Sequence, residues 1–182
     1  MHLTLQTTRE DHRIAWLTAL AITIHIAESA LPSPFPGIKP GLANVVTIIV
    51  LMEFGWSAAV WVALLRVLIG SLLLGTFLSP TFVLSFSGAI GSIALLGLAS
   101  RMPGRGFGPV GYSVLAAMAH MACQFWIAYL LFIQHKAMFH LLPVLMTAAV
   151  ILGLVSGMIA SAILNKFTGH IHDRNPVTSA AN

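Results

Sequence analysis

Long apolar stretches, separated by short breaks that contain glycine or proline, run through almost the whole chain. Of its 182 residues, 58% are hydrophobic and 8% are charged, and the mean hydropathy is +0.92. A soluble domain carries about 25% charged residues, and a soluble fold of this length could not cover so much apolar surface. The sequence therefore predicts an all-α integral membrane protein, in which apolar segments of about 20 residues cross the bilayer.

Glycines and prolines divide the apolar sequence into segments. The prolines between residues 32 and 40 forbid a helix after the first stretch, and Gly55 separates the second stretch from the third. We predict six transmembrane helices, at residues 13–31, 42–54, 56–74, 81–100, 110–133 and 141–164. The second is short for a full span, which favours a tilted or partly re-entrant segment. A six-helix transmembrane domain, 13–165, then lies between a polar N-terminus, 1–12, and a polar tail, 166–182.

The basic residues predict the orientation of these helices. Six helices place both termini on one side of the membrane. That side carries Arg9, Arg13, Arg101, Arg105, Lys166 and Arg174, whereas the other side carries Lys39 and Lys136. By the positive-inside rule, we predict a multi-pass protein of the bacterial inner (cytoplasmic) membrane with both termini in the cytoplasm. The proline-rich loop after the first helix then faces outward.

Several function classes have no support in the sequence. The net charge of +4 comes from basic residues at the ends of segments, so nucleic acid is not an expected partner. Cys123 is the one cysteine, and His120 has no second histidine three or four residues away, so neither a metal site nor a cofactor is predicted. There is no phosphate-binding glycine loop and no nucleophile–base arrangement. We therefore do not expect an enzyme.

A few polar side chains within or beside the apolar stretches are the strongest indication of function. A charged group in the bilayer core costs about 2.5–3.5 kcal/mol or more, so it usually faces the bundle interior and serves a function. At 1.5 Å per residue, these groups gather in the outer half of the predicted bundle, which favours an outward-facing pocket. The candidate substrate-binding residues are Glu28, Lys39, Asn44, Arg66, Ser71, His120 and Gln124.

Each of these groups also has a structural interpretation. Arg66 and Glu28 could form an ion pair that joins two helices, and His120 and Gln124 could form hydrogen bonds between helices, as is common in bundles. Lys39 could extend to the membrane surface. His25 is most simply read as a packed or interfacial histidine.

Small residues repeat at four-residue spacing on two predicted helices. Ala15 and Ala19 form one such step on the first helix, and Gly153 and Gly157 begin another on the last. Small residues at this spacing let helices approach closely. Both steps could pack within the protein, and both could instead dock a second membrane protein; Ala15 and Ala19 are the candidate docking pair.

Three blocks of sequence resemble one known family. They are ESALPSPFPGIKPGLAN at 28–44, LRVLIGSLLLG at 65–75 and HMACQ at 120–124. They resemble the Gx transporter family, also labelled heptaprenyl diphosphate synthase component I, and the resemblance covers roughly residues 15–164. The chain departs from the family pattern at Pro40, where an apolar residue is expected, and at Met121, where asparagine is expected.

Through this family the chain is similar to the substrate-binding S components of energy-coupling factor (ECF) transporters. The resemblance implies a six-helix bundle that captures a vitamin-like or precursor molecule from outside, a loop after the first helix that caps the pocket, and small residues on that helix that meet a coupling protein driven by ATPases. The family label also implies an alternative, a non-catalytic membrane component of heptaprenyl diphosphate synthase in isoprenoid-quinone biosynthesis. Prenyl elongation requires aspartate-rich magnesium sites that bind diphosphate. The two aspartates of this chain, Asp11 and Asp173, lie in its polar ends, which argues against direct catalysis.

Overall fold

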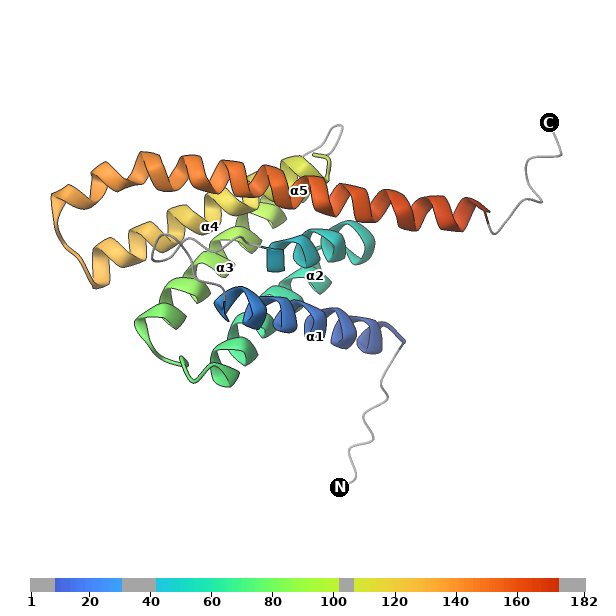
Figure 1. Ribbon diagram of the computed structural model, residues 1–182, viewed down its shortest axis with the longest axis horizontal. Coiled ribbons are helices and arrows are strands. Elements are labelled where there is room, and N and C mark those ends of the chain that lie inside the picture. Colours follow the sequence, from blue (N-terminus) through green and yellow to red (C-terminus); the bar gives the residue numbers. More distant parts are fainter. Residues whose placement is uncertain (1–8, 31–41, 102–106, 174–182) are drawn as a thin grey trace, which may run out of the picture.

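The computed structural model describes residues 9–30, 42–101 and 107–173, and this part of the chain is helical without any strand (Figure 1). Its elements are α1 (Arg9–Ala30), α2 (Leu42–Leu73), α3 (Pro80–Ser100), α4 (Pro109–Leu131), the 3₁₀ helix η1 (Lys136–Leu141) and α5 (Leu142–Asp173). The expectation of an all-α protein is confirmed for these residues.

The long element α2 folds back on itself at Gly55. Gly55 has φ 84° and ψ 179°, a backbone conformation outside the helical region. The Arg66 guanidinium donates hydrogen bonds to Asn44 Oδ1 at 3.2 Å, although in a straight helix the two residues would lie about 33 Å apart at 1.5 Å per residue. Two antiparallel arms, 42–54 and 56–73, therefore replace one rod, and the predicted break at Gly55 is confirmed.

Gly55→Ala is expected to destabilise the protein by about 1–3 kcal/mol, because a side chain disfavours this backbone conformation. A Cβ at Gly55 would meet no atom within 4 Å, so the cost would come from the backbone and not from crowding. Gly108→Ala is the matched control, since that site is equally open but has φ −67°. Thermal unfolding in detergent would measure both variants. Equal melting temperatures for the Gly55→Ala and Gly108→Ala variants would contradict the prediction that a side chain at Gly55 strains the backbone.

The ends of the helices match the predicted ends in the middle of the chain and differ at its extremes. Ser79 caps α3, with its Oγ accepting from Phe82 N at 3.3 Å, and prolines occupy the first turns of α3 and α4, where a missing N–H costs nothing. However, α1 begins at residue 9 instead of 13, and α5 continues to residue 173 instead of 164. Hydropathy marks the apolar part of a helix, whereas backbone hydrogen bonding continues into the polar residues beyond it.

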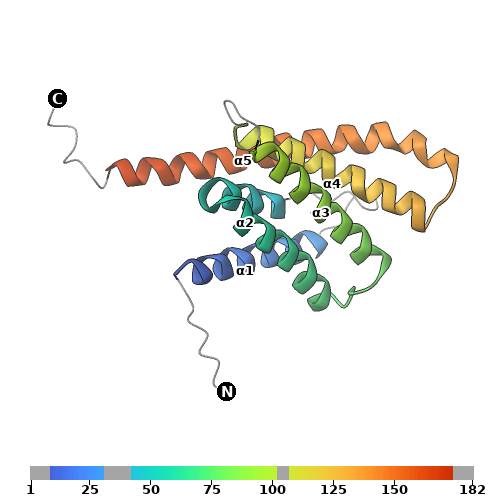
Figure 2. The same cartoon turned by 180° about the vertical axis from the view of Figure 1, so that it is seen from behind.

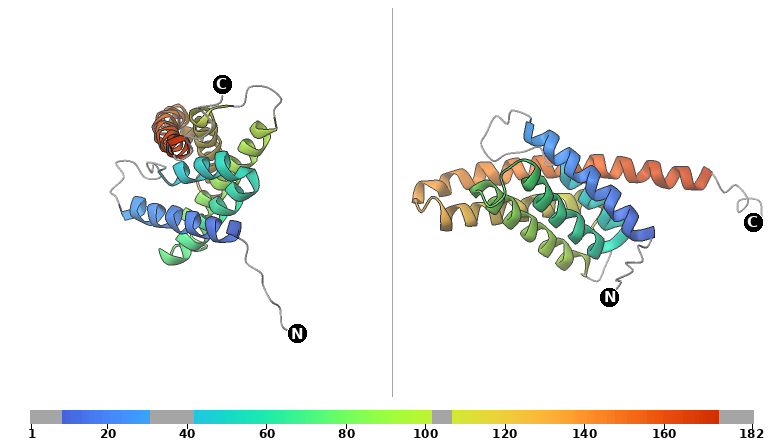
Figure 3. Two further views of the ribbon diagram at one scale, coloured as in Figure 1. Left: turned by 90° about the vertical axis from the view of Figure 1, so that its right-hand side faces the viewer. Right: turned by 90° about the horizontal axis from the view of Figure 1, so that it is seen from below.

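The α2 hairpin is the centre of the bundle. It packs against α1, α3, α4 and α5, and Figure 3 shows it between α1 and the α4–α5 pair. Figure 2 shows α3 alongside α4, with which it makes extensive contact. The core between these helices contains Ile48, Val50, Val62 and Leu96, all almost fully buried. Many large apolar side chains instead face outward, as in a bundle surrounded by lipid.

Four described stretches are long and apolar enough to cross a membrane. They are Asn44–Leu73, Pro80–Ser100, Pro109–Leu131 and Lys136–Lys166, and Ile14–Ala27 is a shorter apolar helix. A membrane helical bundle is therefore supported, while the count of six spans remains a prediction. Because Asn44–Leu73 contains the reversal at Gly55, its arms 42–54 and 56–73 are only about 20 and 27 Å long.

The small residues of α5 pack against α4 within the protein. A Cβ at Gly153 would lie 2.9 Å from Val114 Cα, and a Cβ at Gly157 would lie 2.6 Å from Val110 Cα. Figures 1 and 2 show the two helices side by side. The sequence left open whether these glycines pack within the protein or dock a second membrane protein, and in α5 they pack within the protein.

Candidate functional site

Arg66 lies in the interior of the bundle and joins the two arms of α2. Its side chain is only 5% exposed. Both of its terminal nitrogens donate to the single oxygen Asn44 Oδ1, at 3.2 Å each. Arg66 therefore faces protein and not lipid, as expected for an arginine in a membrane helix.

His120 and Gln124 form a second polar pair, one turn apart on α4. Gln124 Nε2 lies 3.0 Å from His120 Nε2. The predicted common face of these two residues is therefore confirmed by a direct contact. The pair bonds along its own helix, whereas the structural interpretation of the sequence had it bonding between helices.

Glycines on neighbouring helices make room for two imidazole rings. The His120 ring lies against Gly88 of α3, where a Cβ would come within 2.7 Å of ring atoms. The His25 ring of α1 lies against Gly70 of α2, where a Cβ would come within 2.8 Å of Cδ2. Each ring therefore lies in a close contact between two helices, His25 between α1 and α2 and His120 between α4 and α3.

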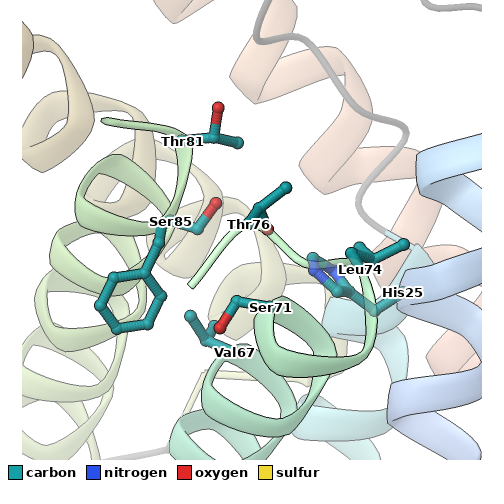
Figure 4. Close-up of a pocket in the computed structure, with 8 residues that line it drawn as sticks. His25, Val67, Ser71, Leu74, Thr76, Thr81 and Ser85 are labelled. Carbon is teal, nitrogen blue, oxygen red and sulfur yellow. The ribbon is translucent and has the colours of Figure 1, made fainter. Parts of the chain in front are cut away.

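A cavity of about 230 Å³ opens beside the His25 ring, between α1, α2, α3 and the turn that joins α2 to α3 (Figure 4). It is lined by His25, Val67, Ser71, Leu74, Thr76, Thr81, Phe82 and Ser85. Five of these eight side chains are polar, which is unusual inside a bundle whose surface is largely apolar. The cavity is the described site that best fits a small solute.

The structure divides the predicted site residues into three groups. Ser71 lines the cavity, and its Oγ donates to the Leu68 carbonyl oxygen at 2.8 Å. Asn44, Arg66, His120 and Gln124 form polar pairs in the interior and are not among the lining residues. Glu28 lies near the end of α1, with its side chain outside the described part of the structure, and Lys39 lies entirely outside the described residues.

Sequence reasoning missed most of the polar lining of the cavity. His25 was read as a packing residue, and Thr76, Thr81 and Ser85 were not selected. Thr81 and Ser85 are four residues apart at the start of α3, so they share one helical face. That spacing is the signal that could have identified them.

Two further observations concern metals and partner docking. Among the described residues, no three His, Cys, Asp or Glu side chains gather as a metal site would require.

A second hollow, a groove of about 470 Å³, runs between α1 and α2. It is lined by Ile14, Ala15, Thr18, Ala19, Ile22, Trp61, Leu65 and Ile69. The predicted docking pair, Ala15 and Ala19, is exposed in this mostly apolar groove.

Comparison with known proteins gives one family match. A family model described as heptaprenyl diphosphate synthase component I matches residues 17–163, which is most of the chain and includes the eight residues named above that line the cavity. No curated protein and no solved structure matches the chain.

Proposed function

The chain belongs to the heptaprenyl diphosphate synthase component I family, also labelled the Gx transporter family, and we propose that it is the solute-binding membrane subunit of an ECF-like transporter. The observation that carries this proposal is the polar-lined cavity of about 230 Å³ inside an apolar helical bundle. A scaffold that only contacts a soluble partner has no need of such a cavity. A subunit that removes a small molecule from water does need one.

The position of the cavity supports capture from outside. Its walls include the α2–α3 turn and His25, near the C-terminal end of α1. Figure 1 shows this end of α1, the α2–α3 turn and the α4–α5 link toward one end of the bundle, away from the first turn of α1 and the last turn of α5. With both termini in the cytoplasm, as the basic residues predict, this end is exoplasmic. A solute would enter here and leave inward after the subunit reorients against its partner.

The groove between α1 and α2 supports docking of a coupling protein. In lipid, helices associate through close packing at small residues, because the surrounding chains are as apolar as the side chains. Ala15 and Ala19 are exposed in a groove that already provides a concave surface for a partner helix. The proposed partners are therefore a membrane-embedded coupling protein and the ATPases that drive it, in addition to the solute and the bilayer.

Ala19→Leu is expected to reduce co-purification of a coupling protein and its ATPases at least about tenfold, because the larger side chain fills the close-approach site. Solute binding by the isolated subunit should be unchanged. Ala27→Leu is the matched control, since Ala27 is also exposed on α1 but does not line the groove. Equal recovery of the ATPases with both variants, measured by quantitative mass spectrometry, would show that the groove is not the docking site.

The family description favours one alternative, a non-catalytic membrane component of heptaprenyl diphosphate synthase. Prenyl elongation requires aspartate-rich magnesium sites, and Asp11 and Asp173 lie at opposite ends of this chain, so a separate subunit would have to perform the catalysis. Deleting the gene distinguishes the two functions. Loss of uptake of one nutrient, with unchanged prenyl chain lengths, supports the transporter. Altered prenyl products with unchanged uptake would replace it with the alternative.

A further inference from the structure

We infer that Ser85 and Thr76 hydrogen-bond the solute in the cavity, and that the part of the solute bound there is a small uncharged polar ring. This inference rests on the proposed function, because it names the ligand class of the same cavity. Figure 4 shows the Ser85 hydroxyl directed toward Thr76 across the cavity, with the His25 ring on the opposite wall.

The hydroxyl of Ser85 differs from the other helical hydroxyls around it. Serines and threonines inside helices usually donate to a carbonyl oxygen one turn earlier. Ser71 donates to Leu68 O and Ser87 donates to Leu84 O, both at 2.8 Å. Ser85, two residues before Ser87 on the same helix, makes no hydrogen bond to any other described residue, and its hydroxyl therefore stays available to a bound molecule.

Thr76 presents a second available hydroxyl from a well-fixed backbone. Its N–H donates to Ser71 O at 2.9 Å, and its carbonyl oxygen accepts from Ser79 N at 3.0 Å. Both backbone groups of Thr76 are thus engaged in the α2–α3 turn, whereas its side chain makes no hydrogen bond within the described part of the chain. Thr76 and Ser85 are both only partly buried, so a ligand in the cavity can replace the water around these hydroxyls and hydrogen-bond to them directly.

The charge of the lining favours an uncharged group. Among the lining residues that the structure describes there is no lysine, arginine, aspartate or glutamate, and His25 is the titratable one. The nearby Arg66 directs both terminal nitrogens to Asn44 and does not line the cavity. The described walls therefore offer a charged group no direct counter-ion for the hydration that it would lose on binding.

The size and apolar walls of the cavity favour one ring. A volume of about 230 Å³ equals roughly seven or eight waters at about 30 Å³ each, and it is smaller than the roughly 300–1,000 Å³ of pockets for drug-sized ligands. Phe82 and Val67 provide apolar surface, and Phe82 is itself supported by Phe86, with ring centroids 5.5 Å apart and planes at 21°. A five- or six-membered heterocycle bearing an amide, a hydroxyl or a ring nitrogen fits these walls.

The test uses the purified full-length protein and matched pairs of probes that differ in charge. The pairs are nicotinamide and nicotinate, uracil and orotate, and a hydroxymethylpyrimidine and its phosphate, each measured by isothermal titration calorimetry. In at least one pair we expect the neutral member to bind at least about tenfold more tightly than the anionic one. Ser85→Ala should weaken that binding about tenfold, as expected for one lost hydrogen bond. Ser87→Ala, whose hydroxyl is satisfied within its own helix, should change it less than about twofold.

Three results would overturn the inference. Tighter binding of the anionic member in every pair that binds would show that the ligand class is wrong. Equal affinities of the Ser85→Ala and Ser87→Ala variants, with both proteins folded by thermal unfolding, would show that Ser85 does not contact the ligand. Failure of all six probes to bind would refute a small neutral ring. None of these results decides the proposed function, which is tested independently by nutrient uptake in the deletion strain.

Discussion

Gly157→Leu is expected to prevent the α4–α5 pair from packing and to cause most of the protein to misfold. A Cβ at this position would lie 2.6 Å from Val110 Cα and 3.0 Å from Ser113 Cβ. Because Val110 Cα belongs to the backbone, no rotamer change relieves the collision, and α4 and α5 must move apart. Overpacking in an ordinary core costs about 1–3 kcal/mol, and we expect at least the upper end of that range here. Yield and melting temperature in detergent would both fall sharply.

Ala162→Leu is the control for this prediction. Ala162 lies on the same helix and is exposed at the surface, so a leucine there can extend into lipid without displacing another helix. We expect its yield and melting temperature to match those of the wild type. A Gly157→Leu protein that unfolds at the wild-type temperature would contradict the close contact between α4 and α5, and with it the assignment of the α5 small residues to internal packing.

The sequence predicted where helices break better than it predicted which helices pack against each other. Glycine and proline act on the backbone of their own segment, so Gly55 and Pro80 marked breaks that the structure confirms. Packing partners depend on distant residues. The step at Gly153 and Gly157 and the step at Ala15 and Ala19 look alike in sequence, yet the first is covered by α4 and the second is exposed. No local pattern distinguishes the two.

The candidate site was predicted in part for a similar reason. Charged and amide groups in apolar stretches are conspicuous, so Arg66, His120 and Gln124 could be recognised, and the structure places them in the interior. Hydroxyls are less informative, because a serine in a helix can satisfy itself on its own backbone. Ser85 and Ser87 are two residues apart and identical in type, and only the three-dimensional arrangement shows which one faces the cavity.

Arg66→Leu is expected to lower stability by about 1–3 kcal/mol and solute uptake at least about tenfold, because Asn44 Oδ1 would lose both of its Arg66 donors in a partly buried position. Arg66 does not line the cavity, so its effect on uptake would come from positioning the two arms of α2, one of which carries Ser71 and Val67 into the cavity wall. Arg66→Lys should recover part of the stability, because an ammonium can donate to Asn44 but lacks the fork of the guanidinium.

A double-mutant cycle separates this hydrogen bond from other consequences of removing the charge. Asn44→Leu alone leaves a buried guanidinium with one acceptor fewer, whereas the Asn44→Leu/Arg66→Leu double variant removes donor and acceptor together. Replacing both partners with apolar groups is often nearly neutral, so the double variant should be more stable than the sum of the two single effects, with a coupling of about 1–3 kcal/mol. If the stability lost in the double variant equals the sum of the losses in the two single variants, the Arg66–Asn44 contact does not hold the two arms of α2 together. If the double variant recovers stability but not uptake, the buried charge itself serves the transport function.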